Sequence, residues 1–164
     1  MQEQLQYLLD RVAIEDTIRS YARGVDRGDF ALLRGLFAAD ARATYAVDDP
    51  IDGGDAIVDW LEERTTGMTY SQHVISPVHL TVEGDTAACQ AYLVSRQMFE
   101  GKDDTLVLMS STYDFAFRRE SEGWRLSELV LRVAWFEEVV APQDALMQRT
   151  SSDVPLAGVA DGGA

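Results

Sequence analysis

The chain has 164 residues and a formal net charge of −14, with 28 acidic against 14 basic side chains. This length fits one domain with a sizeable core. The negative charge repels polyphosphate, which argues against nucleic acid and anionic membrane surfaces as partners.

Several other classes lack support in the sequence. No apolar run approaches the length of a membrane span, and the first residues lack the basic start and apolar core of a signal peptide. Cys89 is the single cysteine and there are two histidines, which excludes an intramolecular disulfide and argues against structural zinc. No Gly-rich phosphate loop or nucleophile elbow is present. We therefore expect a cytoplasmic protein without a cofactor or metal.

The first expected helix runs from about Glu3 to Gly28. Its apolar residues recur at helical spacing: Leu5, Leu8, Leu9, Val12, Ile14, Ile18, Tyr21 and Val25. Asp26 lies at the edge of this stripe, just before the helix ends. Asp29 is the better N-cap for the next helix, expected over residues 30–37, so Asp26 has no obvious structural role. Alone, it could still be a solvated helix-end acid.

The remainder of the chain predicts one more helix and a set of strands. Residues 41–47 read as a short strand, and residues 55–66 as a helix. Strands are expected over 71–82, 86–99, 105–118 and 124–139. Their short connections favour an antiparallel meander and an α+β fold. We expect a domain over residues 1–141 and a tail, 142–164, that is loosely ordered or packs on a neighbouring subunit.

The last strand also predicts an assembly. Residues 129–136 are apolar on both faces of the strand except at Arg132, and residues 106–109 are apolar on both faces as well. A sheet with one solvated face would alternate cleanly between apolar and polar residues. One face should therefore hold helices and a pocket, while another subunit covers part of the other face.

Three further side chains each allow two interpretations. His73 in a strand is either a hydrogen-bonded structural residue or a base; His79, ~20 Å further along the strand, is taken as structural. An unpaired buried guanidinium is costly, so Arg132 either pairs with an acid at an interface or reaches a polar pocket. Tyr21 is either a core aromatic or a hydroxyl donor.

Together these residues form a coherent chemical set. Asp26, accepting from one ring nitrogen of His73, would fix the tautomer and leave the other nitrogen as a base. Tyr21 and Arg132 would supply a donor and a cation where charge develops on oxygen. Such a set suits proton abstraction beside an activating group and requires no metal.

Four stretches carry a family resemblance: LLDRVAIEDTIRSYARGVDRGDFALLRGLFAADA, GGDAIVDWL, QHVISPVHLTVEGDTA and GWRLSELVLRVAW. The chain resembles the SnoaL-like branch of the nuclear-transport-factor-2-like (NTF2-like) superfamily, which includes scytalone dehydratase, bile-acid 7α-dehydratase, hexachlorocyclohexane dehydrochlorinase and ketosteroid isomerase relatives. The resemblance implies a cone of curved antiparallel sheet whose helices close a deep pocket. It also favours a homotrimer over a dimer.

The resemblance assigns roles to the same residues. Asp26 and His73 match the Asp–His dyad of the dehydratase and dehydrochlorinase members, while Tyr21 and Arg132 match a tyrosine and an arginine of bile-acid dehydratases. The second pocket histidine of scytalone dehydratase has no clear counterpart. We predict a cofactor-independent lyase acting on a small, largely apolar cyclic substrate such as a steroid or polyketide. An isomerase, a cyclase, an epoxide hydrolase and a non-catalytic binding module are the alternatives.

Overall fold

The computed structural model describes residues 1–46, 48–102 and 104–140. The predicted tail, 142–164, and the domain boundary at residue 141 lie outside the described residues. Within the described ranges, no helix combines the length and the apolar composition that crossing a membrane requires.

Two helices joined by a tight turn open the chain. The first, α1 (Gln2–Arg27), ends at Gly28, which adopts a left-handed conformation with φ 63°. Glycine tolerates this conformation without a Cβ clash. As predicted, the Asp29 carboxylate accepts a 3.0 Å hydrogen bond from the Leu32 N–H and caps α2 (Phe30–Arg34). The turn fixes where the last turn of α1, with Asp26, meets the sheet.

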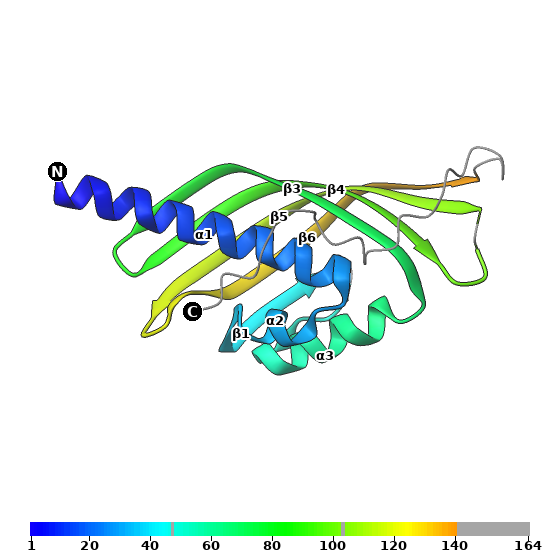
Figure 1. Ribbon diagram of the computed structural model, residues 1–164, viewed down its shortest axis with the longest axis horizontal. Coiled ribbons are helices and arrows are strands. Elements are labelled where there is room, and N and C mark those ends of the chain that lie inside the picture. Colours follow the sequence, from blue (N-terminus) through cyan, green and yellow to red (C-terminus); the bar gives the residue numbers. More distant parts are fainter. Residues whose placement is uncertain (47, 103, 141–164) are drawn as a thin grey trace, which may run out of the picture.

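Only the C-terminal part of the α1 stripe is buried. Ile14, Ile18, Tyr21 and Val25 lie in the core, as predicted. Four apolar residues of the N-terminal turns are instead 55–58% exposed: Leu5, Leu8, Leu9 and Val12. The expectation that they extend the buried stripe is wrong for the single chain, because helical geometry places these four residues on the side of α1 opposite to the buried Asp10, Ile14 and Ile18. The first turns of α1 also extend beyond the ends of the neighbouring strands (Figure 1).

The described residues form a six-stranded sheet in the order β2-β1-β6-β5-β4-β3. The strand bounds are β1 (Phe37–Tyr45), β2 (Ile51–Asp52), β3 (Met68–Glu83), β4 (Thr86–Phe99), β5 (Thr105–Glu120) and β6 (Gly123–Val140). Strands β3 to β6 form the predicted antiparallel meander. However, β1 pairs in parallel with β6, and β2 was not predicted. Phe37, expected to end the second helix, instead begins β1.

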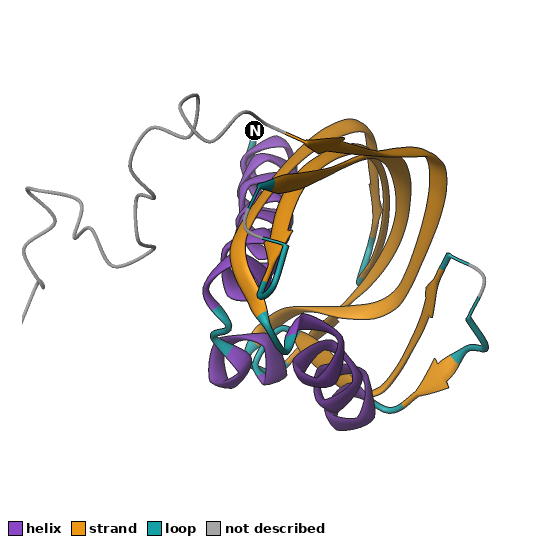
Figure 2. Ribbon diagram, turned by 90° about the vertical axis from the view of Figure 1, so that its right-hand side faces the viewer, coloured by secondary structure: helices purple, strands orange, loops and turns teal. Residues whose placement is uncertain are grey.

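The sheet curls into an arch, and the helices lie along its open side (Figure 2). Helix α3 (Gly54–Thr65) packs on β1, and α1 packs on β3. Buried side chains from the concave face meet those of the helices, including Tyr21, Leu33, Ile57, Leu93, Phe115, Phe117, Leu126 and Leu129. The predicted α+β class with a curved, mostly antiparallel sheet is confirmed.

A buried carboxylate links α1 to the far end of the sheet. Asp10 accepts two 2.8 Å hydrogen bonds from the Arg119 guanidinium and one of 3.2 Å from the Trp124 indole. Gln6 adds a fourth at 3.0 Å. The Arg119 hydrogen bonds lower the pKa of Asp10 to about 2, although burial opposes the shift. The carboxylate therefore stays charged where it holds helix and hairpin together.

Candidate active site

Asp26 and His73 meet where the last turn of α1 contacts β3. The Asp26 Oδ1 atom lies 2.6 Å from His73 Nδ1, and its Oδ2 atom accepts a 3.0 Å hydrogen bond from the His73 backbone N–H. The carboxylate thus holds both the ring and the main chain of the same residue. The predicted contact between these residues, 47 positions apart in sequence, is confirmed.

Two further polar side chains complete the hydrogen-bond network. The Ser71 hydroxyl donates to Asp26 Oδ1 at 2.8 Å. On the other side of the ring, the Gln97 amide nitrogen lies 3.4 Å from His73 Nε2. A carboxylate accepts from Nδ1–H, and an amide N–H donates to a lone pair. Both contacts therefore favour the neutral tautomer with its proton on Nδ1 and its lone pair on Nε2.

The dyad is largely shielded from solvent. The His73 side chain is 7% exposed and the Asp26 side chain 21%. Hydrogen bonds to a charged group strengthen in such surroundings, because water no longer competes for the carboxylate. The site therefore combines a fixed imidazole with a partly desolvated carboxylate.

Tyr21 lies in a cluster of buried aromatic side chains between α1 and the sheet. Its hydroxyl is 3.1 Å from that of Tyr45, and its ring contacts Tyr113 edge-on, with centroids 6.0 Å apart. Burial raises the pKa of all three tyrosines well above the usual value. Each is therefore a neutral hydrogen-bond donor at physiological pH. Among the described residues, no hydrogen bond joins Tyr21 directly to the dyad.

Arg132 requires a correction. Its side chain is 59% exposed and forms an ion pair with Asp114 of the neighbouring strand. Arg132 pairs in register with Thr112, whereas the adjacent pair, Leu131 and Tyr113, is buried on the concave face. Because successive strand residues point to opposite faces, Arg132 lies on the convex face. The pocket-facing assignment is wrong, and the paired-acid interpretation describes this residue.

The structure does not bring His79 to the dyad. His79 is exposed and follows an irregularity in the β3–β4 pairing between Pro77 and His79. This irregularity interrupts the simple alternation of faces that placed His73 and His79 on one side of the strand. His79 therefore supplies no second imidazole beside His73.

Sequence reasoning missed Ser71 and Gln97. Ser71 precedes His73 by two residues and so shares its face of the strand, a signal that was present in the sequence. Gln97 pairs with Ser71 across β3 and β4. That register follows from the whole hairpin and is not visible in the local sequence around Gln97.

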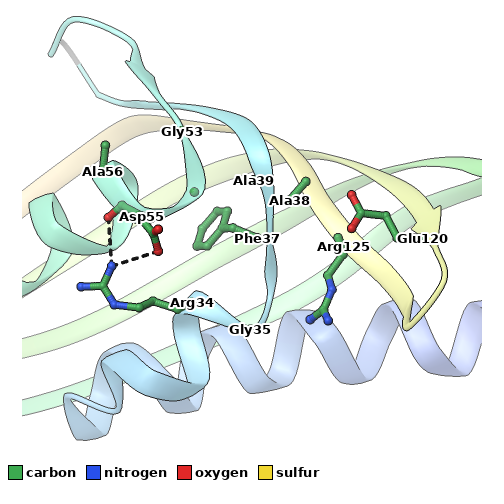
Figure 3. A pocket seen from close by; sticks show the side chains of 11 residues that line it. Arg34, Gly35, Phe37, Ala38, Ala39, Gly53, Asp55, Ala56, Glu120 and Arg125 are labelled. Atoms are coloured by element: carbon green, nitrogen blue, oxygen red, sulfur yellow. Dashed lines mark hydrogen bonds and ion pairs between the residues drawn. The ribbon is translucent and has the colours of Figure 1, made fainter.

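A cavity of about 370 Å³ lies elsewhere, between β1, α2 and the start of α3 (Figure 3). Its lining includes Arg34 and Arg125 but neither member of the dyad. Arg34 donates to Asp55, and Arg125 to Glu122. Since both cations are already paired with acids, this surface cavity offers no free charge for chemistry. In the described ranges, no three His, Cys, Asp or Glu side chains cluster closely enough to hold a metal ion.

Comparison with known proteins places the chain in a family. The family model described as a SnoaL-like domain matches residues 6–130. The chain therefore belongs to the SnoaL-like family, within the NTF2-like superfamily.

Individual relatives agree with this assignment. An uncharacterised protein of Mycobacterium tuberculosis is 27% identical over 118 residues, which cover 71% of this chain and 80% of the relative. An NTF2-like protein with a cystatin-like fold from Novosphingobium aromaticivorans is 25% identical, with a TM-score of 0.71 over 81% of this chain and 87% of its own.

A third similarity concerns the fold alone. Hexachlorocyclohexane dehydrochlorinase type 3 from Novosphingobium barchaimii is 20% identical, with a TM-score of 0.75 over 83% of this chain and 94% of its own. Other structural neighbours include provisionally named dehydratases. These neighbours show that the chain shares their fold.

Proposed function

We propose that the protein is a cofactor-independent lyase that eliminates water, or another leaving group, from a small and largely apolar cyclic substrate. The observation that carries this proposal is the 2.6 Å contact between Asp26 Oδ1 and His73 Nδ1. It orients a histidine as a general base, which is what an elimination needs. The dehydratase and dehydrochlorinase names among the structural neighbours add support.

In the proposed mechanism, His73 Nε2 removes a proton from a substrate carbon. The Asp26 carboxylate stabilises the imidazolium that forms. The electron pair left on carbon forms the new double bond and expels the leaving hydroxyl, which takes the proton back from His73 and departs as water. Gln97 gives up its contact with Nε2 when the substrate carbon approaches.

Asp26 acts through His73 and is itself held in place. Ser71 and the His73 backbone N–H donate to its two oxygens at 2.8 and 3.0 Å. These bonds orient the carboxylate before any substrate arrives, so the correct tautomer requires no rearrangement during the reaction.

Tyr21 is the proposed donor to the leaving group. The Tyr21 and Tyr45 hydroxyls lie 3.1 Å apart, and either can be the donor. When Tyr45 donates to Tyr21, the proton of Tyr21 is free to donate to the leaving group. The raised pKa of both Tyr21 and Tyr45 keeps both protons in place, since burial disfavours the phenolate. Tyr21 therefore suits donation of a hydrogen bond rather than removal of a proton.

A screen for water loss tests the proposal. Purified wild type and Asp26→Asn are incubated with hydroxylated steroids and polyketide fragments, and products are followed by mass spectrometry. We expect at least one compound to lose water with the wild type and to react far more slowly with Asp26→Asn. Equal rates for the two proteins would contradict a reaction at the dyad.

A further inference from the structure

Two buried hydroxyls have no hydrogen-bond partner within the described part of the chain. They are Ser95 Oγ and Ser111 Oγ. Ser95 is 0% exposed and Ser111 4%. Leaving a buried donor unpaired destabilises a fold, so such groups are rare in native proteins and require an explanation. A serine at either position therefore makes the folded state less stable than an alanine there would.

Both serines lie close to the base. Ser95 pairs directly with His73 across β3 and β4 and with Met109 across β4 and β5. Ser111 pairs with Leu93, two residues before Ser95 on β4. Directly opposed residues on neighbouring strands point to the same face with Cβ atoms roughly 5 Å apart, and diagonal ones are roughly 7–8 Å apart. The two hydroxyls and the imidazole thus share the concave face.

Beyond His73 and Gln97, the side chains next to the two serines are mostly apolar. In register with them lie Leu93, Met109 and Val133, and Ile75 lies opposite Leu93. Met109 is only partly buried and has a flexible thioether side chain. Because Met109 pairs with Ser95, movement of this flexible side chain is the route by which we expect a substrate to reach the Ser95 hydroxyl. The serines therefore extend the polar group of His73 and Gln97 across the concave face, between apolar neighbours.

We infer that Ser95 and Ser111 donate hydrogen bonds to an oxygen of the substrate, and that the substrate is a cyclic compound with a carbonyl beside the carbon that His73 deprotonates. This inference rests on the proposed function. Removal of a proton next to a carbonyl moves negative charge onto the oxygen, where two donors shielded from solvent stabilise it. Ser95 provides such a donor one strand away from the base, and Ser111 provides one two strands away.

The reaction balances without a co-reactant. The C–H bond breaks, its proton goes to His73 Nε2, and the electron pair moves onto the carbonyl oxygen held by Ser95 and Ser111. The enolate then forms a carbon–carbon double bond and breaks the C–O bond at the β-carbon. The departing hydroxyl takes the proton from His73 and leaves as water.

The test compares two flat probes that differ by one oxygen. Dissociation constants of 2-naphthol and naphthalene are measured by fluorescence for the wild type, Ser95→Ala and Ser111→Ala. We expect each substitution to weaken 2-naphthol binding about three- to tenfold, the value of one hydrogen bond, and to leave naphthalene unchanged. Ser110→Ala and Ser76→Ala are matched controls, since these serines point to the convex face opposite Val94 and Tyr92.

Melting temperatures separate a ligand site from a structural one. Removing an unpaired hydroxyl should leave the melting temperature of Ser95→Ala and Ser111→Ala equal or higher. A lower melting temperature with unchanged 2-naphthol affinity would assign the hydroxyls a structural partner and overturn the inference. Failure of 2-naphthol to bind the wild type up to its solubility limit would also overturn it.

A third variant distinguishes this inference from the proposed function. His73→Ala removes the base but keeps both serines. If the inference holds, the preference of His73→Ala for 2-naphthol over naphthalene persists and still depends on Ser95. If His73→Ala keeps its preference for 2-naphthol and also retains full turnover, the proposed reaction is contradicted and the inference about the serines is not. Loss of serine-dependent preference in all backgrounds would contradict the inference alone.

Discussion

The position of one proton on His73 decides what the site can do. Asp26 lies against Nδ1 and the Gln97 amide against Nε2, so the neutral ring should carry its proton on Nδ1. Two-bond ¹⁵N–¹H correlation spectra of labelled protein report this tautomer directly. An asparagine at position 26 can turn its N–H group toward Nδ1, so Asp26→Asn should shift the ring toward the Nε2–H form. An Nε2–H tautomer in the wild type would contradict the proposed base.

Tyr21→Phe tests the proposed donor. The phenyl ring keeps its packing against Phe37 and Tyr113, but Tyr45 loses its partner hydroxyl. We expect the free energy of unfolding to fall by about 1 kcal/mol, and turnover to fall less than in His73→Ala. Urea unfolding and rate assays on the same preparations check this. Tyr92→Phe, on the convex face, is the control, and identical turnover in Tyr21→Phe and the wild type would remove Tyr21 from the mechanism.

Sequence reasoning reached some of these residues and missed others for identifiable reasons. Asp26 and His73 stand in family motifs, and their contact could be predicted from the resemblance. Gln97 and Ser95 lie on one strand, and only the β3–β4 register reveals that they lie opposite Ser71 and His73. Arg132 was assigned to the wrong face because its strand carries apolar residues on both faces. The alternation of apolar and polar residues therefore did not show which face Arg132 occupies.

At the scale of elements, Asp10 is the clearest tie between α1 and the sheet. Asp10→Asn keeps the size of the side chain but removes the charge that Arg119 and Trp124 contact. We expect a loss of about 1–3 kcal/mol in the free energy of unfolding at pH 7, measured with urea. Asp16→Asn is the control on the same helix, where an exposed pair with Arg19 contributes no more than about 0.5 kcal/mol.

The ion pair between Asp10 and Arg119 also predicts that the stability of the protein depends on pH. The pKa of Asp10 falls from 3.8 to about 2 on folding, because the folded state holds the carboxylate against Arg119. A carboxylate whose pKa is lowered by folding stabilises the protein at pH values above its ordinary pKa. This stabilisation is lost as the pH falls through the pKa of the folded state. The stability difference between wild type and Asp10→Asn should therefore be full above about pH 4 and shrink toward pH 2. A constant difference over that range would contradict the assignment.

Local signals predicted the elements better than non-local ones did. The Gly28 stop and the Asp29 cap depend on neighbouring residues, so the first turn could be read from the sequence. The parallel pairing of β1 with β6 joins residues more than 80 positions apart, as in Tyr45 with Leu131. The chain between them gives no local sign of that pairing. Without it, the start of β1 could not be distinguished from the end of α2.

At the scale of the whole molecule, apolar surface remains exposed on the single chain. On the convex face the register forms one row from Val74, Val94, Ser110 and Trp135, in which the three apolar side chains are 50%, 43% and 49% exposed. The 60% exposed Tyr92 lies in the next row. Large exposed apolar side chains grouped on one face are typical of an interface between subunits. We propose that this face, with the exposed α1 stripe, is covered in a homotrimer.

Sedimentation velocity tests the assembly. We expect the wild type to sediment as a trimer at micromolar concentration and Trp135→Glu to shift toward the monomer, because a charge would be buried in the interface. Circular dichroism should show that the variant stays folded. Ala31→Glu, at an exposed site on α2, is the control and should remain trimeric. A monomeric wild type would contradict the assembly.

Turnover of His73→Ala tests most directly whether His73 is the base. With a substrate from the water-loss screen, we expect the rate to fall roughly 10²–10⁴-fold, while the melting temperature stays within a few degrees of the wild type. His79→Ala, which removes the other histidine from an exposed site, should retain wild-type turnover. Full activity in a folded His73→Ala protein would contradict the mechanism.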